Sequence, residues 1–439
     1  MRLTIGSARF DWQTSKSNTF TARYDFNENR LQNQGIGGFS LSDHGFNTNT
    51  LEHALRFSDT TVIGTTMVNE ARVGITYIHV GESALSQAPA ILVPGAFSSG
   101  GAIAQSQLSN DLHVEIDDVL STIAGKHKLK FGGQILGKLS GDTRADNFNG
   151  TFIFGGGLAP QLDSNNLVVS NAGVPVLVSI SGLEEYRRTL LGLPGGTPTQ
   201  FSITSGNPAI HVNQWQFSAF VEDDWKLHPN LTLSMGLRYE GQTNPTDKLS
   251  LAPRFGVAYA VDKKQHWIIR GHIGVFYSRI PDALDFDVLR LNGQREQQII
   301  INNPSFPNPF GTGSISATVP TVRELQPGIT PEASLQGQIA IEHQFPHGLA
   351  LYFNESYSKG WNVLRSININ APVLNATADP LTAPRPLGIN ENILQYQSNG
   401  ETSGPVTFIG IKQSDNKHFN VFAGYLYFHL LSNADTPQT

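Results

Sequence analysis

Apolar and polar residues alternate with a period of two along most of the chain, and helical periodicity is almost absent. Successive side chains of an extended chain point to opposite faces, so this pattern predicts strands with one apolar and one polar face. Phe220 and Phe276 break the rule within otherwise regular segments. In segment 230–243 the apolar face carries Leu231, Leu233, Met235, Leu237 and Tyr239, and the polar face carries Thr232, Ser234, Gly236, Arg238 and Glu240.

The alternation predicts about 14 strands, many of them 11 residues or longer. Strands of globular proteins usually have about 5 to 6 residues, whereas a strand tilted across a bilayer needs about 9 to 11. Strand length therefore favours a membrane environment. The predicted strands cover 3–13, 19–31, 48–58, 67–80, 112–123, 127–140, 212–226, 230–243, 250–262, 265–278, 333–345, 348–366, 403–414 and 417–431.

Short and long connections alternate between these strands, apart from the short connection 243–250. Outer-membrane barrels have short turns on the periplasmic rim and long loops on the outer rim, and their strands are apolar outward and polar inward. A soluble sandwich has no reason to alternate in this way. The short turns are 14–18, 125–128, 227–230, 262–265 and 346–348, and the long connections are 32–47, 81–111, 141–211, 279–332 and 367–402.

A wall between lipid and water also accounts for the composition, which is 39% hydrophobic and only 15% charged. Hydrocarbon offers no hydrogen-bond partners, so a spanning sheet has to pair its backbone groups and close on itself. No apolar run exceeds five residues, which excludes membrane-spanning helices of roughly 20 residues. Aromatic residues near the predicted strand ends fit the interfacial girdles of such barrels, namely Trp12, Trp225, Tyr239, Trp267 and Tyr277.

Charge and cysteine content exclude further classes of protein. The chain has 30 Lys and Arg against 36 Asp and Glu, a net charge of −6, so we expect no nucleic-acid partner. With no cysteine, disulfides, thiolate zinc sites and iron–sulfur clusters are excluded. No nucleophile elbow, HExxH, Walker or EF-hand pattern occurs, so we expect no enzyme, no cofactor and no catalytic residues.

Residues 220–240 (FVEDDWKLHPNLTLSMGLRYE), 251–261 (LAPRFGVAYAV) and 268–281 (IIRGHIGVFYSRIP) resemble the barrel of TonB-dependent receptors of the Oar-like class. Three more segments agree with this resemblance. They are 19–41 (TFTARYDFNENRLQNQGIGGFSL), 127–137 (HKLKFGGQILG) and 185–198 (EYRRTLLGLPGGTP).

The resemblance implies a 22-stranded barrel, a plug that fills it, and a periplasmic motif pulled by TonB during uptake. Residues 1–439 contain no plug, TonB-contacting segment or regulatory-like domain, and MRLTIGSARF at the start is not a signal peptide. The predicted first strand starts, and the last ends, at the outer rim, and SNADTPQT (432–439) lacks a terminal aromatic strand. We therefore expect a partial barrel, an internal piece of a longer protein, with the TonB system as a partner of the full-length parent only.

Several local features have simpler explanations than a binding site. Glu222, Asp223 and Asp224 could bind calcium, but on a strand they alternate between faces and are expected at the rim. The 13 histidines are scattered without metal-ligand spacing, so we expect no metal. Lys126, Lys128 and Lys130 are expected to form a turn with lumenal lysines. Segment 183–191 is predicted to be a loop helix, with Glu184 four residues before Arg188. Segment 302–311 is expected to be an extended loop, and GIGGFS (35–40) a glycine loop.

The first functional hypothesis is therefore an outer-membrane receptor and transporter barrel that takes up a nutrient, such as a large, carbohydrate-like or peptide-like one. Two alternatives remain open: a passive porin-like channel of about 14 strands, and an adhesive or structural surface protein. The expected surroundings are outer-membrane lipid and an unknown transported ligand. Alternation assigns faces but does not identify any substrate-binding residue.

Overall fold

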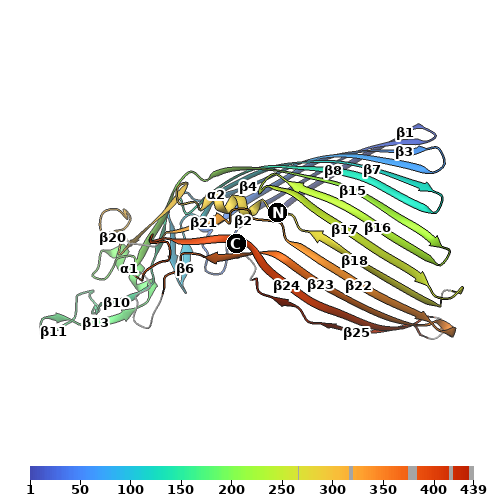
Figure 1. Ribbon diagram of the computed structural model, residues 1–439. Coiled ribbons are helices and arrows are strands. Elements are labelled where there is room, and N and C mark those ends of the chain that lie inside the picture. Colours follow the sequence, from blue (N-terminus) through green and yellow to red (C-terminus); the bar gives the residue numbers. More distant parts are fainter. Residues whose placement is uncertain (265, 316–319, 374–382, 415–418, 435–439) are drawn as a thin grey trace.

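The fold of the chain is a curved antiparallel sheet, seen in a computed structural model that describes residues 1–264, 266–315, 320–373, 383–414 and 419–434 (Figure 1). The sheet has 16 strands, of which β21 (Thr321–Leu325) and β26 (Leu431–Ser432) are short additions to β24. The long strands are β1 (Arg2–Ser15), β2 (Asn18–Gln34), β3 (Phe46–Ile63), β4 (Met67–Ala84), β7 (Ala104–Ala124), β8 (His127–Asp146), β15 (Ala209–His228), β16 (Leu231–Gln242), β17 (Asp247–Ala260), β18 (Trp267–Tyr277), β22 (Ala333–Gln344), β23 (Leu349–Asn368), β24 (Asn392–Gln413) and β25 (Val421–Phe428).

Each long strand pairs antiparallel with the next long strand in the chain, as expected for an up-and-down barrel wall. All the strands predicted from the alternation are present, although Gln265 and residues 417–418 of two predicted segments lie outside the described part. Several strands extend further at the long-loop rim than predicted. β7 begins at Ala104 and β24 at Asn392, because their outer ends are paired polar chain in which the alternation of apolar residues is lost.

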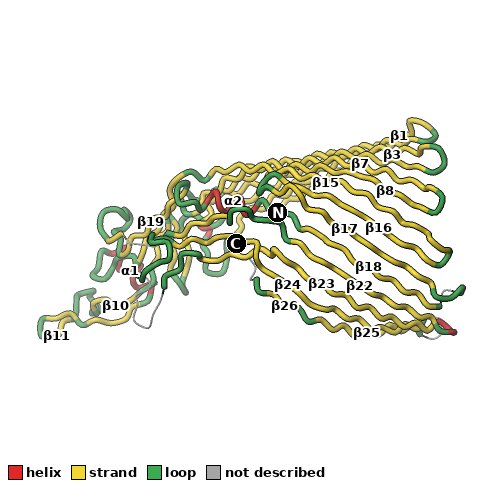
Figure 2. The backbone as a smooth tube through the Cα atoms, in the orientation of Figure 1, coloured by secondary structure: helices red, strands yellow, loops and turns green. Residues whose placement is uncertain are grey.

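The two rims of the sheet differ in the way predicted (Figure 2). Tight turns join β1 to β2, β3 to β4 and β7 to β8, and Gly64 and Gly125 take positive φ angles there that favour glycine. Long connections lie at the opposite end of the strands, apart from the short turn at 243–246. β1 starts at the long-loop rim, as predicted. Of segment 432–439, only residues 432–434 lie within the described part.

The two edges of the sheet are β1 and β25, which do not pair with each other (Figure 1). β1 is hydrogen-bonded on one side only, to β2, and nearly all of its residues are exposed. The described sheet is therefore an open wall. None of the helices in the described residues combines the length and apolar character needed to cross a bilayer.

The long connections build a second, smaller sheet outside the wall. It contains β20 (Ser314–Ile315), β19 (Glu296–Asn302), β14 (Gln200–Gly206), β9 (Thr151–Ile153), β5 (Ala90–Val93) and β6 (Phe97–Ser99). Its core is Val93, Phe152, Phe154, Phe201 and Ile301. A two-stranded arm projects from it, formed by β10 (Gly157–Pro160) with β13 (Leu177–Ile180) and continued by β11 (Ser170–Asn171) with β12 (Val174–Pro175) (Figure 1). Short 3₁₀ turns are η1 (Ser42–His44) and η2 (Pro346–Gly348).

The loop helix predicted at 183–191 is present as α1 (Gly182–Leu191). The hydroxyl of Ser181 caps its start by accepting a hydrogen bond from the Glu184 amide, and Gly192 ends it in the left-handed conformation. The predicted pairing is confirmed, with 2.8 Å between Arg188 Nε and Glu184 Oε1. Arg187 pairs with the same carboxylate, and the two guanidinium groups lower the pKa of Glu184 to about 2.

A second helix, α2 (Ala283–Arg290), lies where the sequence predicts only a long loop. Its apolar residues Leu284, Phe286 and Val288 alternate with Asp285 and Asp287, which is not a helical spacing. Contacts with the sheet, rather than a local pattern, account for this helix.

Candidate functional site

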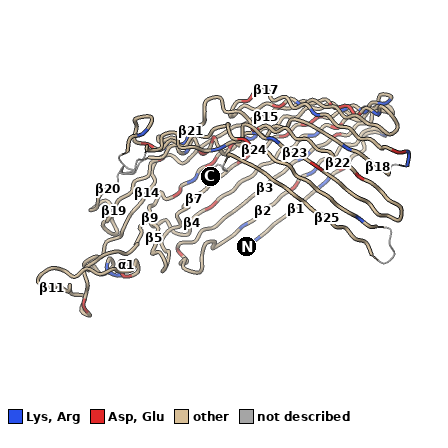
Figure 3. The backbone as a smooth tube through the Cα atoms, turned by 60° about the horizontal axis from the view of Figure 1, so that its bottom comes forward, with Lys and Arg blue, Asp and Glu red and all other residues tan. Residues whose placement is uncertain are grey.

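The 16-stranded sheet, here called the wall, has one apolar face and one polar face. On β16, Met235 and Leu237 are 41% and 46% exposed, while their neighbours Ser234, Arg238 and Glu240 face the other side. α2 lies on the polar side, with contacts to β15 and β21, and Figure 1 shows it inside the curve of the sheet. The polar side is therefore the concave, lumenal one. Charged residues lie along the strands as well as at the rims (Figure 3). An apolar outer face and a charged inner face suit a wall between lipid and water.

The aromatic residues expected at the interfaces lie on the apolar face at both rims. Trp12, Trp225 and Trp267 stand at the short-turn ends of their strands, and Tyr239 and Tyr277 stand at the long-loop ends. The Trp267 ring stacks on His343 with 3.9 Å between ring centroids. This arrangement matches the two girdles of an outer-membrane barrel.

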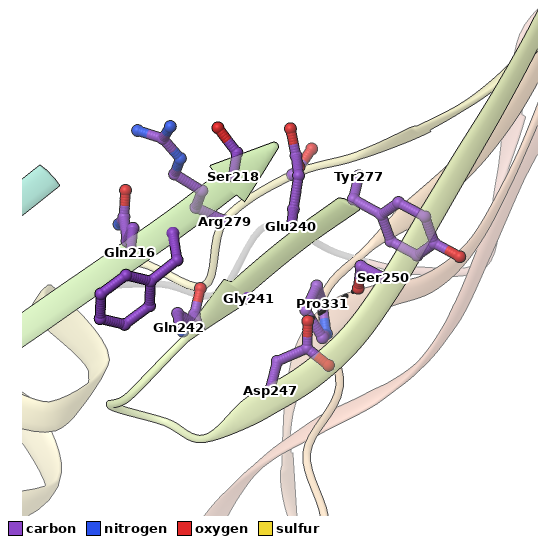
Figure 4. Close-up of a pocket in the computed structure, with 12 residues that line it drawn as sticks. Gln216, Ser218, Glu240, Gly241, Gln242, Asp247, Ser250, Tyr277, Arg279 and Pro331 are labelled. Carbon is purple, nitrogen blue, oxygen red and sulfur yellow. Dashed lines mark hydrogen bonds between the residues drawn. The ribbon is translucent and has the colours of Figure 1, made fainter. Parts of the chain in front are cut away.

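A small pocket lies at the outer ends of β15–β18 (Figure 4). Its volume is about 20 Å³, enough for about one water molecule. In Figure 4 the side chains of Gln216, Ser218, Glu240 and Arg279 stand together on one side of the strands. Arg238 joins this group by donating to Ser218 Oγ at 3.0 Å and to Glu240 Oε1 at 2.6 Å. The pocket is too small for a solute, but its polar rim forms part of the lumenal wall.

Two buried glutamines attach the chain entering α2 to this wall. Gln242 Oε1 accepts a hydrogen bond from the Ile280 amide at 3.1 Å, and Gln214 Nε2 donates to the Ile280 carbonyl at 3.0 Å. Ile280 itself is buried with Leu284, Ile329 and Tyr396. The segment before α2 is therefore fixed to the wall by both backbone and apolar contacts.

Ion pairs hold both ends of α2 against β8. Lys138 Nζ lies 2.6 Å from Asp282 Oδ2 at the start of the helix, and Arg290 Nη2 lies 2.6 Å from Asp142 Oδ2 at its end. The second pair is largely shielded from solvent, with side chains 13% and 11% exposed. Salt weakens buried pairs less than exposed ones, so the Arg290 end is the firmer attachment. α2 therefore lies against the polar face of the wall, near the long-loop end of β8.

Asp285 of α2 carries the most strongly shifted carboxyl in this region. Burial, followed by the charge of Asp282, raises its pKa to about 6. Its Oδ2 atom is buried and has no hydrogen-bond partner among the described residues. The neutral, protonated form is therefore favoured in mildly acidic solution.

The residues considered singly in the sequence take up ordinary structural positions. Glu222 and Asp224 lie opposite Lys130 and Lys128 on the lumenal side, and Asp224 accepts a hydrogen bond from Ser234 at 2.6 Å. Asp223 faces the other side, as the predicted alternation requires, and bonds to His127 at 2.7 Å. The described residues contain no group of three or more His, Asp or Glu side chains placed to hold a metal ion.

Two cation–π contacts explain the aromatic residues that break the alternation. The guanidinium of Arg254 lies 4.6 Å from the centre of the Phe276 ring, and that of Arg238 lies 5.8 Å from the centre of the Phe220 ring. Both phenylalanines are thus lumenal. The sequence shows that the two phenylalanines stand on an otherwise polar face. It does not show the strand register that places each arginine next to its ring.

A curved wall with these two faces defines the class of the protein as an outer-membrane β-barrel. A family model described as an outer membrane beta barrel domain matches residues 4–249 and 241–439, and the chain belongs to this family. No curated protein matches the chain.

Solved structures with a similar fold include transporters and receptors. The outer membrane transporter YddB from Escherichia coli has a TM-score of 0.65 at 11% identity, over 98% of this chain and 48% of that one. The siderophore receptor PirA from Acinetobacter baumannii has a TM-score of 0.53 at 8% identity, over 97% and 52%. The RagAB peptide transporter has a TM-score of 0.54 at 11% identity, over 98% and 47%. The chain spans about half the length of these proteins, and at such identities the likeness establishes the fold.

Proposed function

We propose that the chain is part of the barrel wall of a TonB-dependent transporter that takes up a nutrient across the outer membrane. The observation that carries this proposal is the charged concave face, with α2 attached to it near the long-loop end, in a fold shared with outer-membrane transporters. At the long-loop end, the connections form the smaller sheet, which has its own apolar core and could make the first contact with a solute.

The proposal includes further strands between β25 and β1. Unpaired backbone groups at those edges cannot be satisfied by hydrocarbon, so an open wall is not stable in a bilayer. Residues 1–439 would then be one barrel segment, working with a plug and a TonB-contacting segment of the whole protein.

Uptake by a strain that carries the whole gene, compared with its deletion strain, tests this function. A panel of single carbon and nitrogen sources serves as the probe, with and without a proton-motive-force uncoupler. We expect the deletion to abolish uncoupler-sensitive uptake of one or a few related nutrients. Size-limited, uncoupler-insensitive loss across many solutes would support the porin instead, and unchanged uptake of every nutrient would contradict transport.

The arm gives specific support to the surface-binding alternative. Segment 164–181 has no charged residue, and Leu167 and Val174 near the tip of the arm are 64% and 67% exposed. Apolar side chains at the tip of a projecting ribbon are typical of a contact surface. Loss of cell adhesion, without loss of uptake, after deletion of residues 161–176 would favour this second function.

A further inference from the structure

Three arginines lie side by side in register on the lumenal face of the first three strands. Arg9 is directly opposite Arg23, and Arg23 is directly opposite Arg56. Like charges directly opposite each other destabilise a sheet. Exposed ion pairs contribute little to stability, so the pairs that these residues form with Asp11 and Asp25 do not by themselves explain such a row.

Beside the row of arginines the wall has a gap at Gly74, here called the notch, and acidic residues lie on the far side of this notch. Gly74 of β4 is opposite Arg56 on one side and opposite Glu115 of β7 on the other. Glycine has no side chain, so the wall is low at this position, and the Glu115 carboxylate lies beside the gap with its Oε2 atom 3.9 Å from where a Cβ on Gly74 would be. The cavity here has a volume of about 490 Å³, within the range of small-molecule sites.

Positive and negative charge are separated across this notch. On the basic flank, Arg9, Arg23 and Arg56 stand with Asp11 and Asp25, which gives 3 − 2 = +1. The acidic flank carries Glu70, Glu115 and Asp117 with Arg72 and with Arg279, whose charge acts on Glu115, which gives 2 − 3 = −1. A simple anion would meet both signs of charge, whereas a zwitterion can place each of its ends against the opposite sign.

Donor groups remain available on the basic flank. Arg56 is 54% exposed and donates only from Nη1, to Asp25 Oδ2 at 2.6 Å. Its Nε and Nη2 atoms donate to no other residue in the described part of the chain. They are free to bind a carboxylate, to which arginine can donate two parallel hydrogen bonds.

We propose that this notch binds a small zwitterion of the amino acid or short peptide class, its carboxylate on Arg56 and its ammonium on Glu115. Two strand spacings separate the two Cα atoms by about 10 Å. An extended dipeptide is about 7 Å long and fits between the two side chains. The inference rests on the proposed uptake function, because it names the substrate class of that lumen.

Calorimetric titration of the whole protein that contains this chain, in detergent micelles, tests the site with three peptides: Ala-Ala, N-acetyl-Ala-Ala and Ala-Ala-amide. Only the first carries both charges. We expect Ala-Ala to bind about tenfold more tightly than either blocked peptide. Equal binding of all three, tighter binding of the acetylated anion, or no binding of Ala-Ala would overturn the proposal.

Matched variants locate the site. Arg56→Gln and Glu115→Gln should each weaken Ala-Ala binding about tenfold and remove the preference over one blocked peptide. Arg270→Gln is the control, because Arg270 is also a lumenal arginine with a carboxylate neighbour, Glu342 at 3.6 Å. An equal effect of the control would overturn the assignment.

Gly74→Met tests the notch without changing charge. A Cβ on Gly74 would be 3.6 Å from Glu115 Cβ, an ordinary contact, so the backbone tolerates it while the longer side chain fills the space. We expect the variant to fold, as judged by heat-modifiable electrophoretic mobility, and to lose binding. Retained binding would contradict the site. Binding in micelles does not require transport, so a failed site and a failed uptake function give separate results.

Discussion

The ring of Phe220 occupies the space in front of Gly132, the residue directly opposite it on the neighbouring strand. A Cβ built on Gly132 would lie 2.3 Å from the Phe220 Cε1 atom. An aromatic ring lying over a cross-strand glycine supplies the packing that glycine lacks. This pair therefore helps to fix the register of β8 against β15.

Substituting this glycine should destabilise the wall. Gly132→Ala forces the Phe220 ring to move, and we expect a loss of about 1–3 kcal/mol in the free energy of unfolding. Urea titration of the whole protein that contains this chain, in lipid vesicles, measures the loss. Gly133→Ala is the control, because its Cβ would approach nothing closer than the Ser218 carbonyl oxygen at 3.6 Å. Equal losses in both variants would rule out the ring contact as the cause.

Removing the buried attachment of α2 should release that end of the helix. Arg290→Gln leaves Asp142 as a shielded charge without its partner, a change that typically costs about 3–5 kcal/mol. We expect much faster hydrogen exchange of the amides of residues 283–290. Lys138→Gln removes the more exposed pair, in which Lys138 is 38% exposed, and should cost about 0–1 kcal/mol. A larger effect for Lys138→Gln would reverse the roles assigned to the two ends.

The docking of α2 should depend on pH through Asp285. Its pKa is raised from 3.8 to about 6 in the folded chain, so the folded form binds this proton more tightly than the unfolded form. The stability of the docked helix therefore falls as pH rises from about 4 to about 6 and is level above that window. Exchange of the amides of residues 283–290, corrected for the intrinsic rate, should be slower at the acidic end.

Asp285→Asn is the matched variant for this dependence. The amide is neutral at every pH, so exchange should become independent of pH across the window, and slower than in the parent at neutral pH. If the parent shows the same protection throughout the window, Asp285 does not control the docking.

The wall itself was predictable because its signal is local. Each strand of the barrel carries its own alternation, and lipid on one side enforces it over the full width of the membrane, as in Met235 and Leu237 against Ser234 and Arg238. The outer ends of β7 and β24 lack this constraint, so their extra length was not predicted.

Features that depend on how neighbouring strands are aligned could not be predicted from the sequence. The row Arg9, Arg23 and Arg56 is formed by residues on three strands, and a shift of one residue in any pairing would separate them. α2 likewise depends on Lys138 and Asp142 of β8, far away in the chain. Glu184 with Arg188 was predictable, since four residues of one helix fix that contact.

A cysteine scan of β16 is the most direct test of a wall between lipid and water, since the chain has no native cysteine. Single cysteines at Ser234, Met235, Gly236 and Leu237 of the whole protein, with any cysteine outside residues 1–439 replaced, would carry a fluorophore in lipid vesicles. The fluorophore would be quenched either by lipid-attached nitroxide or by aqueous iodide. The account predicts lipid quenching at 235 and 237 and aqueous quenching at 234 and 236. Loss of this alternation, or shielding of all four positions from both quenchers, would contradict it.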